Sequence, residues 1–326
     1  MSKKYRAVEL TNENNAVISG GQMLNTKIKK ELKNICESGG GRVLFDFPLS
    51  TCNTIGVGGK AAAWCTPVDV KTLQRIKLFL DSVNVPVMVI GNGSNILISD
   101  KGIDTVVLKL EGDFFECIRI KKSVVRAGAG THLRRLIAHS CLNGLSGLEG
   151  LVGIPATIGG ALKINASHIS AISENLLKVL ILNSRGKFEW LKKEEIDFGY
   201  RYSSFKKQDI IVQADFDFKK APVLEIKNKM KEYFSLKMRT QPLGAKTLGC
   251  IFKNPLASKY TSGQLIDKAG KKGFQCGNAK ISEKHANFII NTGQATASDI
   301  SNLIQNVKYD IEKKFSVTLE PEIEIL

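Results

Sequence analysis

Two glycine clusters constrain the possible fold and ligand of this chain more than any other feature of the sequence. The first, Gly91 to Asn95 (GNGSN), directly follows the apolar run Val85 to Ile90, and the second, Gly153 to Ala161 (GIPATIGGA), comes about sixty residues later. Glycines permit positive φ and close backbone approach, so successive N–H groups can surround a pyrophosphate. The first cluster alone could equally be a turn between strands, and it is not the GxGxxG of a Rossmann site. The pair of clusters supports a shared dinucleotide and two structural turns about equally.

The bulk composition indicates a folded cytoplasmic protein. Its 326 residues suit two or three domains, and 43% hydrophobic with 24% charged residues is ordinary for a globular protein. The longest apolar runs fall well short of the ~20 residues that span a bilayer. The N-terminus (MSKKYRAVELTNENN) continues with polar residues where a secretory signal would have an apolar stretch. We therefore expect no membrane contact.

Cysteine spacing and charge exclude several other classes of protein. The seven cysteines form no CxxC pair and have no histidine at metal-ligand spacing, which disfavours a disulfide framework and a metal site. The net charge of +16 suits a nucleic-acid binder in principle, but the basic residues are interleaved with Asp and Glu along the whole chain. A solvated basic surface, or a site for anionic small ligands, is favoured over nucleic acid.

The pattern in the first third of the chain predicts an N-terminal extension followed by a βαβ-like unit. Residues 1–42 contain one amphipathic helix, with Ile28, Leu32 and Ile35 on one face, and are expected to be an N-terminal extension. Residues 43–110 show a strand, a helix at helical spacing from Leu73, and the buried strand that leads into the first glycine cluster.

The remaining pattern predicts two further α+β units and a closing strand. Residues 111–219 contain short strands and one helix from Thr131 to Leu142, and residues 220–317 begin with a long helix, Val223 to about Met238. Residues 318–326 alternate apolar and charged side chains and are expected to form a strand that joins the unit at 43–110. The fold class is therefore α+β and not doubly wound.

Arg201 lies between two aromatic residues, Tyr200 and Tyr202, in a segment that resembles a loop. A guanidinium offers a planar fork for a carboxylate or phosphate, and aromatic neighbours strengthen that contact by lowering the local dielectric. An exposed loop arginine stacked on tyrosines is the alternative interpretation.

Cys250, in the segment LGCIFKNP, is a candidate proton donor. A free thiol has a pKa near ~8.5, so it holds a proton at neutral pH and can deliver it to a carbanion. The alternative is a small buried hydrophobe, since cysteine is among the most buried residue types. Lys253 and Asn254 beside it favour a polar, ligand-facing site.

Three glutamates, Glu320, Glu322 and Glu324, alternate along the closing strand and are expected on one of its faces. A buried carboxyl has a raised pKa and can act as a protonated donor. Three solvent-facing glutamates on an edge strand are the alternative.

Eight segments in a fixed order resemble one enzyme family, UDP-N-acetylenolpyruvoylglucosamine reductase. They are PLSTCNTIGVGGKAA, IGNGSNILISD, GLEGLVGIPATIGGALKINA, FGYRYSSFK, GCIFKNP, SGQLIDKAG, KHANFIINTG and LEPEI, and they run from about Pro48 to Glu322. The resemblance implies a two-subdomain FAD-binding fold of the vanillyl-alcohol-oxidase (PCMH) type with a C-terminal α+β substrate domain. It also implies a monomer that uses NADPH to reduce UDP-N-acetylglucosamine enolpyruvate to UDP-N-acetylmuramate in bacterial peptidoglycan precursor synthesis.

The resemblance also assigns residues. Arg201, Cys250 and Glu322 match the catalytic positions, and the 49 positions from Arg201 to Cys250 resemble the short form that lacks a tyrosine-bearing insertion. The positions implied for the substrate are Tyr200, Arg239, Lys253, Asn254 and Gln264. The positions implied for FAD are Asn53, Gly58, Gly91, Asn92, Gly93, Ser94, Asn95, Gly153, Ile154, Pro155, Thr157, Gly159 and Gly160.

The chain departs from the family pattern at two places. The family usually continues NAGAYG where this chain reads NASHIS, which changes the contacts expected near Ser167 and His168, and Gly56 replaces a commonly basic residue. The nearest alternative function is another FAD oxidoreductase or oxidase of the same fold, which would lack GCIFKNP and the terminal glutamate.

Overall fold

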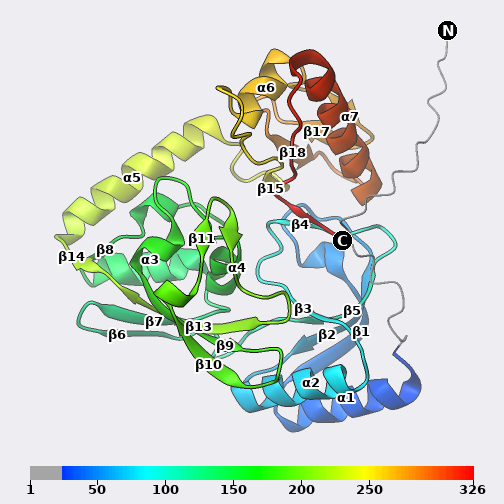
Figure 1. The fold of residues 1–326 in the computed structure, drawn as a ribbon, viewed down its shortest axis with the longest axis vertical. Coiled ribbons are helices and arrows are strands. Elements are labelled where there is room, and N and C mark those ends of the chain that lie inside the picture. The colour runs from blue at the N-terminus through cyan, green and yellow to red at the C-terminus, as the bar shows by residue number, and fades with distance from the viewer. Residues whose placement is uncertain (1–23) are drawn as a thin grey trace.

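The computed structural model describes residues 24–326, which form three α+β units (Figure 1). In that view the first unit is blue to cyan, the second is green, and the third is orange to red. One long helix, α5 (Val223–Thr240), leads from the second unit to the third. Residues 1–23 of the expected N-terminal extension lie outside the described residues. None of the described helices is long and apolar enough to cross a membrane.

The first unit is a four-stranded sheet with two helices packed against it. Its elements are α1 (Thr26–Ser38), β1 (Arg42–Pro48), β2 (Lys60–Thr66), α2 (Val70–Ser82), β3 (Val87–Val89), β4 (Ile96–Leu97) and β5 (Ile103–Leu108). The sheet order is β1-β2-β5-β3, in which β1 and β2 are antiparallel and β5 is parallel to both β2 and β3. Helix α1 contacts both α2 and β1, so the predicted helix at the end of the extension is part of this unit's packing.

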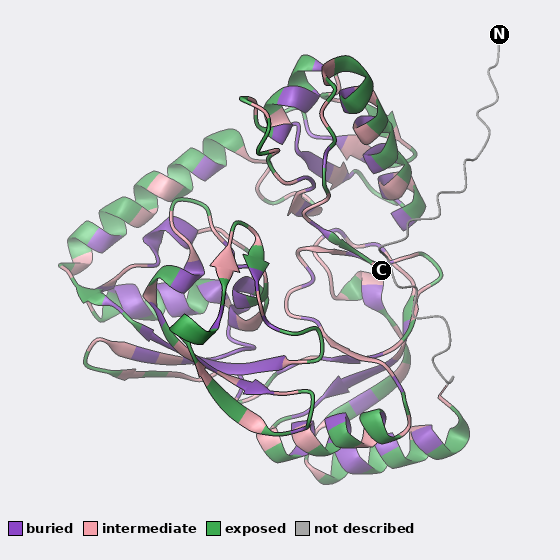
Figure 2. Ribbon diagram, in the orientation of Figure 1, coloured by how far each residue is buried: buried purple, intermediate pink, exposed green. Residues whose placement is uncertain are grey.

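The second unit is built on a five-stranded antiparallel sheet. Its elements are β6 (Ile118–Lys121), β7 (Val124–Gly128), α3 (Leu133–Leu142), β8 (Leu145–Ser146), α4 (Ile158–Lys163), β9 (Leu176–Leu182), β10 (Phe188–Lys192), β11 (Phe198–Gly199), β12 (Tyr202–Ser203), β13 (Ile210–Asp217) and β14 (Lys219–Lys220). The sheet order is β10-β9-β13-β7-β6. Strand β13 is buried along nearly its whole length, which Figure 2 shows as a purple band.

The third unit has a four-stranded sheet and two helices. Its elements are β15 (Thr247–Cys250), α6 (Ser262–Lys268), β16 (Gln275–Cys276), β17 (Ala279–Ile281), β18 (Phe288–Asn291) and α7 (Ala297–Phe315). The sheet order is β15-β18-β17-β16. The chain then returns to the first unit, where β19 (Glu324–Ile325) pairs with β4 in parallel.

Local sequence explains where the main helices begin. The Asp69 side chain accepts a hydrogen bond from the Thr72 N–H at 2.7 Å and starts α2. At the start of α7, Thr296 and Asp299 bond each other's backbone N–H groups in a capping box. The buried faces of both helices follow the apolar periodicity in the sequence.

The α+β fold class and the predicted helices of α2, α5 and α7 are confirmed. The closing strand is shorter than predicted, because only Glu324 and Ile325 form a strand and the preceding residues follow an irregular path. The three glutamates therefore do not share one face: Glu322 is turned inward, whereas Glu320 and Glu324 are exposed. The second glycine cluster ends in the short helix α4.

Candidate active site

A cleft of about 720 Å³ lies where the three units meet. The first unit contributes Ser94 and Asn95 to its lining. The second unit brings Arg201 into the cleft, the third brings Cys250, and the closing segment that returns to the first unit brings Glu322. The structure thus places the three predicted catalytic side chains together.

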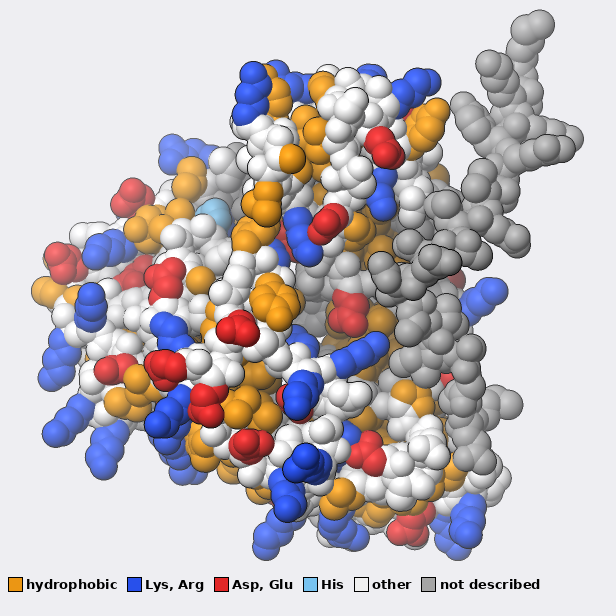
Figure 3. Space-filling model, viewed as in Figure 1, with side chains coloured by type: hydrophobic (Ala, Val, Ile, Leu, Met, Phe, Trp, Pro, Cys, Tyr) orange, Lys and Arg blue, Asp and Glu red, His pale blue; other side chains and the backbone are white. Residues whose placement is uncertain are grey.

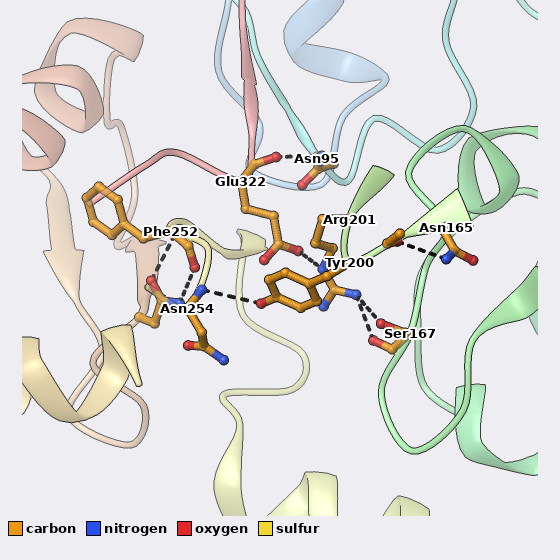
Figure 4. Close-up of polar contacts among 10 residues, drawn as sticks. Asn95, Asn165, Ser167, Tyr200, Arg201, Phe252, Asn254 and Glu322 are labelled. Atoms are coloured by element: carbon orange, nitrogen blue, oxygen red, sulfur yellow. Dashed lines mark hydrogen bonds and ion pairs between the residues drawn. The ribbon is translucent and has the colours of Figure 1, made fainter. Parts of the chain in front are cut away.

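Arg201 occupies the two-residue turn between β11 and β12, and its backbone φ is +55°. A residue with a side chain rarely adopts this left-handed conformation, and such exceptions concentrate at functional sites. The guanidinium is partly covered by the Tyr200 ring, whose centroid lies 5.4 Å away. Its Nε donates to the Glu322 carboxylate, and its Nη1 donates to Ser167 (Figure 4). The arginine predicted from the motif is therefore anchored in the cleft.

Two backbone hydrogen bonds fix the position of Glu322. Its N–H donates to the Ile251 carbonyl at 2.7 Å, and its carbonyl accepts from the Asn95 side chain at 3.2 Å. Its side chain is 9% exposed and pairs with Arg201. Burial raises the pKa of this carboxyl above its usual range, although Arg201 and Lys253 act in the opposite direction. Glu322 is thus poised to carry a proton at a higher pH than an ordinary glutamate.

Cys250 ends β15, one residue after Gly249, whose φ is +80°. Glycine adopts this conformation without steric cost, and the pairing register of β15 with β18 shifts at the same point. Burial and the neighbouring Glu322 carboxylate raise the pKa of the Cys250 thiol to about 12, against the opposing influence of Arg201 and Lys237. The thiol is therefore protonated at neutral pH.

Lys237 is a functional candidate that the sequence interpretation missed. It lines the cleft from α5 and is 3% exposed, yet its ammonium has no hydrogen-bond or ion-pair partner among residues 24–326. Burial lowers its pKa to about 8. The signal was present in the sequence: Ile226, Met230 and Phe234 form an apolar stripe at helical spacing, and Lys237 continues it. In the structure only Ile226 and Lys237 of this helix are buried, which makes Lys237 a candidate for binding an anionic group.

The two glycine clusters lie against each other. The Asn92 amide donates to the Pro155 carbonyl at 3.0 Å. A Cβ atom added at Gly91 would come within 2.4 Å of the Thr157 hydroxyl, so only glycine permits this approach. A second cavity, of about 180 Å³, opens at this contact and is lined by Gly91, Thr157, Gly159 and Gly160.

These cavities fit FAD. The smaller cavity and the large cleft lie on either side of the paired glycine clusters, since Ser94, Asn95 and Gly153 to Ala156 line the cleft. A long dinucleotide can therefore run past both clusters, with close backbone approach where side chains are missing. Within the described part of the chain, no cluster of three or more His, Cys, Asp or Glu residues is placed to hold a metal ion.

Some residues predicted at FAD shape the loops behind the cavities. The Asn53 amide donates to the carbonyls of Leu49 and Val57 at 2.7 and 2.8 Å and so closes its own loop. A Cβ at Gly93 would lie 2.6 Å from the Asn53 Cα, and one at Gly58 would lie 2.9 Å from a side-chain atom of Ile98. These positions line neither cavity.

Of the residues predicted to bind the substrate, some line the cleft and others do not. Tyr200 and Asn254 line the cleft and meet across it, since the Asn254 N–H donates to the Tyr200 hydroxyl at 3.3 Å. Gln264 instead accepts from the Thr261 N–H in the capping box of α6. Lys253 pairs with Glu320 at 3.4 Å, and Arg239 is exposed in the last turn of α5.

Comparison with known proteins gives consistent matches. The model of the C-terminal domain of UDP-N-acetylenolpyruvoylglucosamine reductase matches residues 241–326, and that of an FAD binding domain matches residues 61–192. UDP-N-acetylenolpyruvoylglucosamine reductase 1 of a Bacillus cereus strain is 40% identical over 305 residues, which cover 90% of this chain and 98% of the relative. The enzyme of Bacillus subtilis is 37% identical over 302 residues, 92% of this chain and 99% of the relative.

A solved structure agrees with these relatives. The crystal structure of UDP-N-acetylenolpyruvylglucosamine reductase from Thermus caldophilus superposes with a TM-score of 0.75 at 36% identity, and the match covers 87% of this chain and 98% of that one. Sequence, domain models and fold therefore agree along nearly the whole length of the chain. The chain belongs to the UDP-N-acetylenolpyruvoylglucosamine reductase family of FAD-containing oxidoreductases.

Proposed function

We propose that this chain reduces the enolpyruvyl ether of UDP-N-acetylglucosamine enolpyruvate to UDP-N-acetylmuramate, with NADPH as reductant, in peptidoglycan precursor synthesis. The observation that carries the proposal is the convergence of Arg201, Cys250 and Glu322 on one cleft. Bound FAD would supply the transfer of a hydride from NADPH to the methylene carbon of the enolpyruvyl group. The paired glycine clusters are the proposed FAD contacts, which supports FAD-binding subdomains at 43–110 and 111–219 and a substrate domain at 220–317.

Arg201 and Glu322 are proposed to stabilise negative charge. When a hydride adds to the methylene carbon, charge develops on the adjacent carbon and its carboxylate. The guanidinium carries a fixed positive charge, and a carboxyl of raised pKa can donate a hydrogen bond when protonated. Preorganised donors of this kind are typically worth ~3 to 4 kcal/mol each in a transition state.

Cys250 is proposed to supply the proton that completes the reduction. Its thiol remains protonated at neutral pH because its pKa is raised to about 12. A carbanion is basic enough to take a proton from such a thiol, and a general acid must lie within hydrogen-bond reach of the reacting atom. Its position beside Glu322 and Arg201 in the cleft supports this role.

Lys237 is proposed to bind an anionic group of the substrate. Lys237 lines the cleft, and its side chain is almost wholly buried. A buried cation without a protein partner is unfavourable until a ligand supplies the opposite charge. Tyr200 and Asn254 are proposed as neighbouring contacts at the same ligand, and Arg239, Lys253 and Gln264 as contacts at its periphery.

We further propose that the protein is a cytoplasmic monomer that acts on a small anionic substrate without nucleic acid or membrane. On the face shown in Figure 3, basic and acidic side chains are intermingled, with no continuous basic stripe. Nucleic-acid binding needs clustered positive charge along one face.

An anaerobic mixing experiment tests the function. Protein whose flavin has been reduced with NADPH is mixed with UDP-N-acetylglucosamine enolpyruvate, and flavin absorbance is followed. We expect rapid reoxidation with formation of UDP-N-acetylmuramate, and none with UDP-N-acetylglucosamine, which lacks the enolpyruvyl group. Reoxidation by oxygen alone, with no response to the enolpyruvyl substrate, would instead identify an oxidase of the same fold.

A further inference from the structure

The Arg201 guanidinium is held at two of its three nitrogens. Nε donates to the Glu322 carboxylate, and Nη1 donates both to the Ser167 carbonyl at 3.0 Å and to the Ser167 hydroxyl at 2.7 Å (Figure 4). Within residues 24–326, Nη2 has no acceptor. The hydrogen bonds of Nη1 thus both go to one serine, and the two N–H groups of Nη2 are left for a ligand.

These contacts fix the direction of the remaining donors. A guanidinium is planar and its five N–H groups form a rigid fork, so holding Nε and Nη1 defines where Nη2 points. Arg201 needs such support, because its φ of +55° persists only where surrounding contacts hold it. Its side chain starts from a two-residue turn that is itself paired by two short strands.

The loop that carries Ser167 is tied to the hairpin that carries Arg201. The Asn165 amide donates to the Gly199 carbonyl at 2.9 Å, and Ser167 forms an isolated bridge with Ala171. The serine hydroxyl is therefore presented by a fastened loop. Ser167 also lines the cleft, and because its oxygen accepts from Arg201, its own proton can be donated to an acceptor there.

We propose that Ser167 is a positioning residue for the reduction, whose hydroxyl orients the Arg201 guanidinium so that Nη2 faces the carboxylate of the substrate. The proposal rests on the role of Arg201 proposed above. This positioning role differs from a structural role, because the hydroxyl sets the direction of a charged donor. The packing of the loop does not depend on the hydroxyl, since other contacts already hold the loop in place.

Three variants test this assignment. Ser167→Ala removes the hydroxyl but keeps the carbonyl contact, Ser167→Thr keeps a hydroxyl, and Ser170→Ala is the control. Ser170 lies in the same loop, and its hydroxyl has no hydrogen-bond partner among the described residues. Each protein is reduced with NADPH and mixed anaerobically with UDP-N-acetylglucosamine enolpyruvate, and the substrate dissociation constant is measured separately from the perturbation of the oxidised flavin spectrum.

We expect Ser167→Ala to slow reoxidation by about tenfold to a hundredfold, the range for a hydrogen bond to a charged group, with a smaller change in the dissociation constant. The limb of the pH profile that reports Glu322 should move to higher pH, because a loosened Arg201 lowers that pKa less. Ser167→Thr should recover most of the rate, and Ser170→Ala should match the wild type.

A Ser167→Ala protein with a wild-type rate and pH profile would overturn the proposal. So would a Ser167→Thr protein as slow as Ser167→Ala. If the Ala protein loses its flavin, Ser167→Thr is compared with the wild type, and a rate at least about tenfold slower than wild type would overturn the proposal. Failure of the proposed function looks different, because the wild-type protein itself would then not be reoxidised by the substrate.

Discussion

At the scale of single residues, the protonation state of Cys250 decides what its side chain can do. With a pKa raised to about 12, the thiol is a proton donor at neutral pH and a poor thiolate nucleophile. Its neighbours explain this state: the Glu322 carboxylate opposes a second negative charge, and burial removes the water that would solvate one.

Replacing Cys250 should separate the two halves of the reaction. We expect Cys250→Ala to leave flavin reduction by NADPH nearly intact and to slow reduction of the enolpyruvyl substrate by about 10² to 10⁴, the usual contribution of a general acid. Cys250→Ser should retain activity because a hydroxyl can also donate a proton. Stopped-flow absorbance measures both steps, and an Ala variant with both at wild-type rates would refute the assignment.

Lys237 should lower the free energy of unfolding at neutral pH. Its pKa in the folded protein is lowered from 10.5 to about 8, so the folded state holds the proton less tightly than the unfolded state. The cost is fully present below about pH 8 and disappears as the pH rises above 10.5. Lys237→Met should therefore be more stable than the wild type at pH 7, by up to about 3 kcal/mol, and the difference should vanish near pH ~11.

Urea unfolding at both pH values, without substrate, measures this difference. The matched control is Lys231→Met, an exposed lysine on the same helix. Because the proposed role of Lys237 is to bind an anion, the same Met variant should bind the UDP-sugar at least tenfold more weakly. Equal stability of Lys237→Met and wild type at pH 7 would contradict the inference.

At the scale of elements, the pairing of β15 with β18 holds Cys250 in place. The buried Asn287 amide donates to the Phe252 carbonyl at 2.8 Å and accepts from the Phe252 N–H at 2.9 Å, directly after β15. The Ile251 N–H donates to the Asn287 carbonyl at 2.9 Å. One side chain therefore replaces the ladder that a regular strand would supply at the point where β15 ends.

Removing this amide should destabilise the third unit. Asn287→Ala leaves a buried N–H and a buried carbonyl without partners, each worth roughly 1 to 3 kcal/mol, so we expect a loss of about 2 to 6 kcal/mol in the free energy of unfolding. Asn302→Ala, at an exposed position of α7, should change it by less than about 0.5 kcal/mol. A small effect at Asn287, measured in urea, would show that the strand pairing does not depend on it.

The elements differ in how far the sequence predicts them. Helices α2 and α7 could be predicted because their apolar stripes and caps are local. The meeting of Arg201, Cys250 and Glu322 could not follow from local pattern, because these residues are far apart in the sequence, and family resemblance supplied it. Ser167 was noted only as a departure from the family pattern and Asn287 was not noted at all. Their roles depend on contacts 34 and 35 positions away, which no periodicity records.

At the scale of the whole molecule, the third unit shares an apolar core with the first. Ile55, Val57 and Leu97 of the first unit pack into the core of the third. Two hydrogen bonds reinforce this junction: the Thr54 hydroxyl donates to the Thr247 carbonyl at 2.6 Å, and the Asn291 amide donates to the Ile55 carbonyl at 2.9 Å. The second unit reaches the third across the cleft through the polar contact of Tyr200 with Asn254.

Asp100 adds a cap to this junction. Its carboxylate accepts from the N–H groups of Ala297 and Ser298 at 2.8 and 2.9 Å and from the Ser298 hydroxyl at 2.8 Å, so the first unit satisfies the start of α7. Although partial burial raises its pKa, these hydrogen bonds outweigh that effect and hold the pKa of Asp100 below its ordinary value. A negative charge here also complements the positive end of the helix dipole.

Asp100→Ala should therefore loosen the junction by about 1 to 2 kcal/mol, the cost of losing a helix cap, while Asp113→Ala, at an exposed position, should have little effect. Because the folded pKa is depressed, this stabilisation is full above about pH 4 and is lost as the pH falls through the folded pKa. Urea unfolding at pH 7 and pH 3 should show a difference from wild type at the higher pH that shrinks at the lower. A difference of equal size at both pH values would mean that the carboxylate charge does not hold the two units together.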